Sequence, residues 1–205
     1  MRKDFYVGTL LVLTSACLFY TGISPYNRLT WFMEVLPVII ALPVLILTYR
    51  KYPLTHLLYF LIFLHCLILV TGGNYTYSKV PLGFWLQDLF HFTRNHYDRI
   101  GHFAQGFVPA IIAREILLRG KFVNGGKMLA FIVVCICLAV SAAYELIEWF
   151  AAVMLGQGAD AFLGTQGDNW DTQWDMFMAL CGAAAALITL SRLHDGQIAK
   201  LKSRV

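Results

Sequence analysis

The stretch MLAFIVVCICLAVSAAYELIEWFAAVML, residues 128–155, decides the fold class because it is long, almost wholly apolar and free of proline and glycine. A helix needs about 20 such residues to cross ~30 Å of hydrocarbon. Comparable blocks cover residues 6–23, 29–49, 54–71, 98–118 and 171–193. Helices satisfy their own backbone hydrogen bonds in lipid. The sequence therefore predicts an all-α, polytopic membrane helix bundle with about six transmembrane helices.

Composition supports this class. Of the 205 residues, 59% are hydrophobic and 14% are charged, whereas soluble domains carry about 25% charged residues. No linker or internal repeat divides the chain, so we expect one integral membrane domain over residues 1–205. The net charge of +4 needs no nucleic acid to explain it. The first apolar block resembles a signal peptide, but its apolar run continues past Cys17, which favours a retained first span.

Lysine and arginine predict the orientation. Six spans place both termini on one side of the membrane, and twelve of the sixteen basic residues then share that side with the termini. Cytoplasmic loops carry such an excess, so both termini should be cytoplasmic. The cytoplasmic set is Arg2, Lys3, Arg50, Lys51, Arg114, Arg119, Lys121, Lys127, Arg192, Lys200, Lys202 and Arg204, and the outer set is Arg28, Lys79, Arg94 and Arg99.

The longest connection, residues 72–97, should lie on the outer side. Its run Pro81–Phe92 mixes aromatic and polar residues, which is typical of a short helix lying in the membrane interface. Two pairs of small residues, Ala139 with Ala143 and Gly182 with Ala186, have the spacing that lets helices approach closely in lipid.

The acidic residues gather at the outer ends of three spans. Asp98 and His102 are four residues apart and share a helix face. Glu145 and Glu148 lie in the outer part of span 128–155. The polar run Gly164–Met176 adds three further carboxylates, which are Asp168, Asp171 and Asp175. Six carboxylates and one imidazole could then converge on one outward-facing pocket, and charged residues inside membranes are candidate functional sites.

Six neighbouring anions repel one another strongly at low dielectric. Shared protons, an arginine partner such as Arg94, or a bound cation would relieve this repulsion. Carboxylates with one imidazole suit Mg²⁺, Mn²⁺, Ca²⁺ or Zn²⁺, so the cofactor expected is a divalent cation. The predicted metal ligands are Asp98, His102, Glu145, Glu148, Asp168, Asp171 and Asp175.

Simpler interpretations stay open for these residues. Asp168 and Asp171 could cap the N-terminus of the last span, where anions are favoured. His102 alone could be a hydrogen-bonded core histidine. Glu145 and Glu148 could be ordinary interfacial acids. The five cysteines all fall in predicted spans without a Cys-x-x-Cys pair, which indicates no thiolate metal site.

Three segments carry a family resemblance. Asn95–Ala110 with its Asp98-x-x-x-His102 pair, the run Glu145–Trp149, and the run Gly164–Met176 resemble the signatures of the YjdF-like bacterial inner-membrane proteins. That family is catalogued as a domain of unknown function, so the resemblance implies the bacterial inner membrane and no reaction. A weaker resemblance to VanZ-like membrane proteins rests on Asp98, His102, Phe103, Glu145, Asp171, Asp175 and Gly182, and implies a role in the cell envelope.

The pattern supports two classes of function. In the first, an enzyme acts on an envelope lipid or lipid-linked substrate, with the cation polarising the reacting group and a side chain serving as general acid or base. The catalytic candidates are Asp98, His102, Glu145 and Asp175, and the partners are membrane lipids and a lipid headgroup or small polar ligand. The second class is a cation- or proton-coupled binding or transport protein, which would need a polar path below Gln105. A structural or assembly role without catalysis is a third reading.

Overall fold

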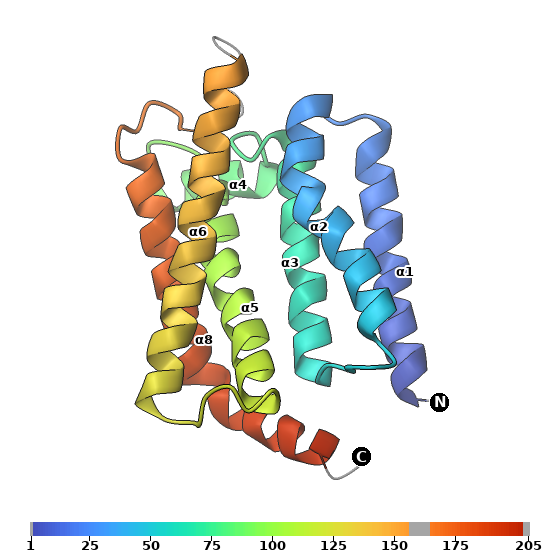
Figure 1. Ribbon diagram of the computed structural model, residues 1–205. Helices are drawn as coiled ribbons and strands as arrows, with labels where there is room; N and C mark the ends of the chain where they lie inside the picture. The colour runs from blue at the N-terminus through green and yellow to red at the C-terminus, as the bar shows by residue number, and fades with distance from the viewer. Residues whose placement is uncertain (1, 156–164, 203–205) are drawn as a thin grey trace.

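The computed structural model describes residues 2–155 and 165–202. Its helices are α1 (Arg2–Ile23), α2 (Arg28–Thr48), α3 (His56–Tyr75), α4 (Pro81–Phe90), α5 (Tyr97–Arg119), α6 (Lys127–Leu155) and α8 (Asp171–Lys202). The described residues contain no strand. Six long helices run side by side, and both chain ends lie at the same end of the bundle (Figure 1). The predicted all-α fold, the six long helices and the short helix in the outer loop are confirmed.

Five of the long helices, α1, α2, α3, α6 and α8, are long and apolar enough to cross a membrane by composition alone. The 23-residue α5 is long enough but is not among them, because its two ends carry charged side chains. It lies against α3, α6 and α8, and those neighbours bury much of its surface. We therefore count α5 as the sixth span because of its position in the bundle and not because of its composition.

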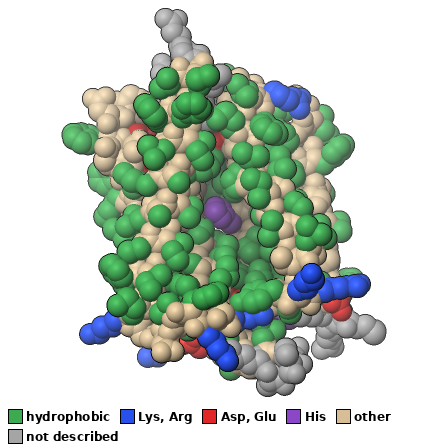
Figure 2. All heavy atoms as spheres, viewed as in Figure 1, with side chains coloured by type: hydrophobic (Ala, Val, Ile, Leu, Met, Phe, Trp, Pro, Cys, Tyr) green, Lys and Arg blue, Asp and Glu red, His purple; other side chains and the backbone are tan. Residues whose placement is uncertain are grey.

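The helices form two groups of three. One group is α1, α2 and α3, and the other is α5, α6 and α8, with α3 packed against α5 between them. The main core lies around this junction and includes Leu58, Ile111, Val133 and Ala183. Lysine and arginine side chains gather mostly at the end that carries the termini (Figure 2), as the positive-inside pattern predicts.

Helices α5 and α8 form the most extensive helix pair in the described residues, because glycines let their backbones meet. A Cβ at Gly106 would overlap the carbonyl oxygen of Ala179, and a Cβ at Gly182 would overlap that of Phe103. The expected close packing at Gly182 and Ala186 is confirmed, since both are buried. This seam holds the N-terminal half of α5 against the start of α8.

The expectation for Ala139 and Ala143 is wrong, because both are exposed. The buried face of α6 is a different stripe, at Leu129, Val133, Cys137, Ser141, Glu145 and Glu148. This stripe keeps the spacing of three or four residues that one helix face requires. It carries two carboxylates into the bundle at the end opposite the termini.

Candidate functional site

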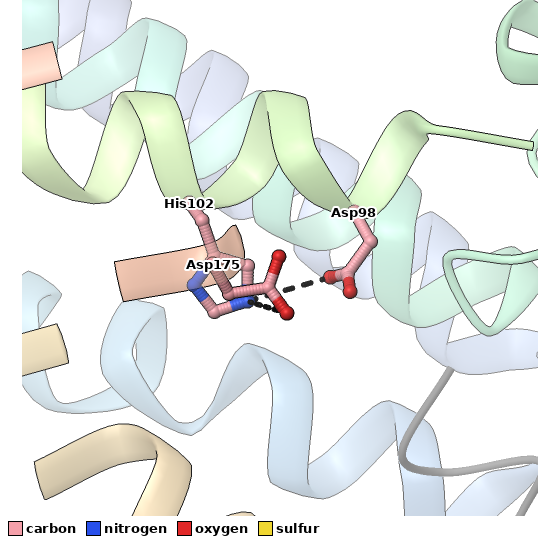
Figure 3. A group of neighbouring side chains, drawn as sticks. All are labelled: Asp98, His102 and Asp175. Carbon is pink, nitrogen blue, oxygen red and sulfur yellow. Dashed lines mark ion pairs between the residues drawn. The ribbon is translucent and has the colours of Figure 1, made fainter. Parts of the chain in front are cut away.

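A compact group of three side chains lies where the outer parts of α5 and α8 meet. Asp98 and His102 come from α5 and Asp175 from α8, and the three point toward one another (Figure 3). One ligand atom of each lies within 4.8 Å of the other two. His102 Nε2 is 3.6 Å from Asp98 Oδ1 and 3.9 Å from Asp175 Oδ2. The predicted shared face of Asp98 and His102 is present.

A proton on His102 can be located from its second contact. Nδ1 lies 3.1 Å from Gln105 Oε1, and an amide oxygen only accepts hydrogen bonds. In this contact Nδ1 is the donor, and the other ring nitrogen, Nε2, faces the two carboxylates. Three potential ligand atoms, one imidazole nitrogen and two carboxylate oxygens, thus converge on one point, and this donor set suits a divalent metal ion.

The spacing of these atoms agrees with one ion between them. Ligands about 2.1 Å from a metal and at a tetrahedral angle to one another lie about 3.4 Å apart. The observed separations of 3.6 and 3.9 Å need only a small closure. Asp175 is 2% exposed, and its Oδ1 has no hydrogen-bond partner among the described residues. A buried carboxylate oxygen without a partner is costly, and a cation would satisfy it.

Glu145 on α6 is a third carboxylate close to the His102 imidazole. Its Oε1 lies 3.6 Å from His102 Nδ1 and makes no hydrogen bond within the part of the chain that is described. Its residue is 7% exposed. One turn deeper, Ser141 is fully buried and its hydroxyl is also unpartnered there. Helices α6 and α8 thus both carry buried oxygens without a hydrogen-bond partner among the described residues.

Asp168 and Asp171 lie outside the three-residue group because arginines hold them. Arg94 Nη2 is 2.5 Å from Asp171 Oδ1 and 3.6 Å from Asp168 Oδ2. Arg99 Nη2 is 3.0 Å from the same Asp168 oxygen, while Asp168 Oδ1 accepts from the backbone N–H of Trp170. Asp168 therefore stabilises the turn that precedes α8, which begins at Asp171. Gly164, the first residue of the polar run, lies outside the described residues.

A small cavity adjoins the group on its other side. It is lined by Asp98 and His102 and also by Glu34, Tyr144 and Glu148. The space open to the centre of a water molecule is about 20 Å³, enough for one or two waters or one small polar group. Glu148 thus faces this cavity and is not part of the three-residue group.

Sequence reasoning missed Glu34, Tyr77 and Tyr144 as members of the site. Glu34 is 4% exposed and accepts a hydrogen bond from the Tyr144 hydroxyl at 3.1 Å. The two residues are 110 positions apart, so no local spacing could reveal them. Tyr77, in the loop after α3, also lines the cavity. Burial, with the nearby Glu34 carboxyl, raises its pKa well above the usual value of 10.0, so its phenol stays neutral.

Below the site the bundle is closed by apolar side chains. Ile111 of α5, Val133 and Cys137 of α6, and Ala183 and Ala186 of α8 are each fully buried in one continuous core. The acidic site is thus reached from one end of the bundle or from its side.

A second polar cluster lies beneath that apolar layer, near the termini. Glu115 is fully buried and accepts from the Thr55 hydroxyl at 2.8 Å, from Arg119 at 2.7 Å and from His194 Nε2 at 2.9 Å. Arg114 lies 3.1 Å from His194 Nδ1. Since a guanidinium only donates, Nδ1 is the acceptor in this contact, and Nε2 is the donor to Glu115. The cluster is fully paired, so it ties α5 to α8 and to the segment before α3.

Comparison with known proteins now identifies the family. A model of predicted membrane proteins (DUF2238) matches residues 6–196. Inner membrane protein YjdF of Escherichia coli (strain K12) is 58% identical over 196 residues, which cover 96% of this chain and 94% of that protein. No solved structure matches the chain. With its apolar spanning helices, the chain is a multi-pass protein of the bacterial inner membrane, and it belongs to the DUF2238 family of predicted membrane proteins.

Proposed function

We propose that this protein binds a divalent cation through Asp98, His102 and Asp175 and uses it to act on a membrane lipid or lipid-linked substrate. The observation that carries the proposal is the convergence of His102 Nε2 with two carboxylates, at 3.6 Å from Asp98 and 3.9 Å from Asp175. Asp175 Oδ1 and Glu145 Oε1, both buried and unpartnered among the described residues, support it independently. A metal ion would neutralise this group and complete its coordination.

The chemistry follows from the neighbours of the cation. A bound divalent ion polarises a phosphoryl or acyl oxygen and lowers the pKa of a coordinated water. Glu145, held beside His102 but outside the three-residue group, is the carboxylate best placed to accept a proton from that water. Asp98, His102 and Asp175 hold the ion, while the hydrogen bond to Gln105 orients the imidazole ring.

The apolar layer favours this function over coupled transport. A transporter needs a polar route from one side of the membrane to the other. Ile111, Val133 and Ala186 lie between the acidic site and the Glu115 cluster and are fully buried. A one-sided site reached by its substrate from the outer end or the bilayer fits this arrangement better.

Metal analysis of the purified protein tests the cation site. Protein equilibrated with Mn²⁺, Zn²⁺, Mg²⁺ or Ca²⁺ in turn should retain close to one equivalent of one of them, and Asp175→Asn and His102→Ala should lose it. The matched control is Asp88→Asn, which neutralises an exposed acid on α4 and should retain the metal. Equal retention by Asp175→Asn and Asp88→Asn, or no metal in the parent protein under any supply, would contradict the proposal.

A lipid comparison tests the activity. A deletion strain complemented with Asp175→Asn should show the same altered lipid or lipid-linked profile as the uncomplemented deletion strain, and complementation with Asp88→Asn should restore the parental profile. Identical profiles in all four strains would remove the enzymatic part of the proposal and leave a structural role.

A further inference from the structure

The cavity beside Asp98, His102 and Asp175 is also lined by two glutamates that are not among the proposed ligands of the cation. Glu34 of α2 and Glu148 of α6 face the same space as Asp98 and His102. They are 4% and 9% exposed. Neither forms an ion pair with a lysine or arginine in the described part of the chain.

Their hydrogen bonds leave most of their capacity unused. Glu34 accepts one hydrogen bond, from Tyr144. Glu148 accepts none from the residues described here, although it is nine-tenths buried and lines the cavity. An ionised carboxylate has about four lone-pair sites. The two glutamates therefore present several acceptor sites, with Tyr144 as the one donor to them among the described residues, to a space the size of one or two waters.

An ammonium group suits this wall better than a second metal ion. Among the described residues, Glu34 and Glu148 do not converge with a third ligand as Asp98, His102 and Asp175 do. A primary ammonium carries three donors and one positive charge. It can serve both glutamates at once, and a charge-assisted bond of this kind is about twice as strong as a neutral one.

Next to this cavity, helices α2 and α6 leave a hollow between the two halves of the bundle. Helix α2 packs on α1 and α3, and α6 packs on α5 and α8, but α2 and α6 are not a closely packed pair. Figure 2 shows the resulting hollow between the two halves, with hydrophobic side chains along it and a histidine inside. Because α2 and α6 both have the length and composition of membrane-crossing helices, the hollow faces hydrocarbon. The Glu34–Tyr144 hydrogen bond joins α2 to α6.

We propose that this cavity receives the primary amine of a zwitterionic phospholipid head group, such as that of phosphatidylethanolamine. The amine lies between Glu34 and Glu148, the phosphate faces the cation at Asp98, His102 and Asp175, and an acyl chain lies in the hollow between α2 and α6. This inference rests on the proposed function and names its substrate class. The lipid enters sideways, and the Tyr144 hydroxyl releases Glu34 to the arriving amine.

Photolabelling in vesicles tests the inference. The protein is reconstituted in phosphatidylcholine vesicles that contain a trace of phosphatidylethanolamine with a diazirine near the end of one acyl chain. A parallel sample carries the same chain on phosphatidylglycerol, which lacks the amine. Labelling of peptides from α2, α5 and α6 should be about tenfold greater with the amine-bearing lipid, the factor given by a binding difference of about 1.4 kcal/mol. Equal labelling by the two lipids would overturn the inference.

Variants locate the effect. Glu34→Gln combined with Glu148→Gln should bring labelling by the amine-bearing lipid down to the phosphatidylglycerol value, whereas Asp88→Asn should change nothing. Undiminished preference in the double variant contradicts the amine site. The comparison of the two lipids on the parent protein needs no variant, so poor folding of the double variant does not rescue the inference. Loss of labelling on addition of an equal concentration of soluble phosphoethanolamine would assign the cavity to a soluble ligand and overturn the lipid.

The same samples separate this inference from the proposed function. Metal retained with no lipid preference refutes the amine site and leaves the cation site standing. A clear preference in protein that binds no metal refutes the cation site and leaves the amine site standing.

Discussion

Replacing Gly106 with alanine is expected to force α5 and α8 apart. The added Cβ would overlap the carbonyl oxygen of Ala179, far inside the 3.0 Å that real Cβ atoms keep. Because that oxygen belongs to backbone, it cannot rotate away, and the helices must separate by about 1 Å at a cost of about 1–3 kcal/mol. For a chain of 205 residues, this lowers the unfolding temperature by roughly 2–12 °C.

The separation should also reach the site. Asp175 lies one helical turn before Ala179 on α8, so its 3.9 Å separation from His102 Nε2 should lengthen to about 5 Å, beyond what one ion can bridge. Thermal unfolding in detergent and metal binding measure the two effects on one sample. Gly196→Ala is the matched control, since a Cβ there meets nothing within 4 Å and alanine favours a helix over glycine by about 1 kcal/mol.

The contrast between the two glycines decides the outcome. Gly106→Ala should melt lower and bind metal more weakly, while Gly196→Ala should melt at or above the parent temperature with unchanged metal. If Gly106→Ala unfolds at the parent temperature, the close approach of α5 and α8 does not hold the site together and the reasoning is wrong.

Three other perturbations follow from the same contacts. Glu115→Ala should lower stability by about 3–5 kcal/mol, because it removes a fully buried carboxylate that pairs with half-buried Arg119 and fully buried His194. Chemical unfolding measures this loss, and a loss below 1 kcal/mol would contradict the prediction. Arg94→Ala should speed the hydrogen exchange of the backbone amides before α8, since Arg94 donates to the carbonyl oxygen of Thr165 and to Asp171. Unchanged exchange in that segment would argue against this prediction. Burial lowers the pKa of His96, and the nearby Arg99 and Arg94 lower it further. The neutral imidazole therefore stabilises the fold above the unfolded pKa of 6.5, and this contribution is lost as the pH falls. His96→Gln should flatten the fall in unfolding temperature between about pH 7 and 5, and an unchanged slope would refute this prediction.

The fold was predictable because its signals are local. Apolar blocks of spanning length predict the helices, and the four-residue spacing of Asp98 and His102 predicts one shared face. The excess of basic residues near one end predicts the orientation. Each of these depends on residues within a few turns of one another, so the sequence alone carries them.

The composition of the site depends on contacts that spacing cannot express. Glu34 enters through a hydrogen bond to Tyr144, 110 residues away. Asp171 is held by Arg94 across a gap of 77 residues, and only the packed structure assigns this arginine to it. Ala139 and Ala143 show the converse, since a suitable local spacing does not decide which helix face is buried.

The polarity of α5 has a consequence for how the protein enters the membrane. During synthesis α5 leaves the ribosome before α6 and α8, the helices that cover much of its polar surface. Charged side chains raise the cost of moving an isolated segment into lipid, and α5 carries charged residues near both of its ends. Among the six long helices described, it is the one that is not apolar enough to span a membrane by composition alone. It is therefore expected to wait at the translocon and move into lipid together with its later neighbours. Insertion of this half of the molecule is then a concerted event, and its topology is settled only after α8 has been made.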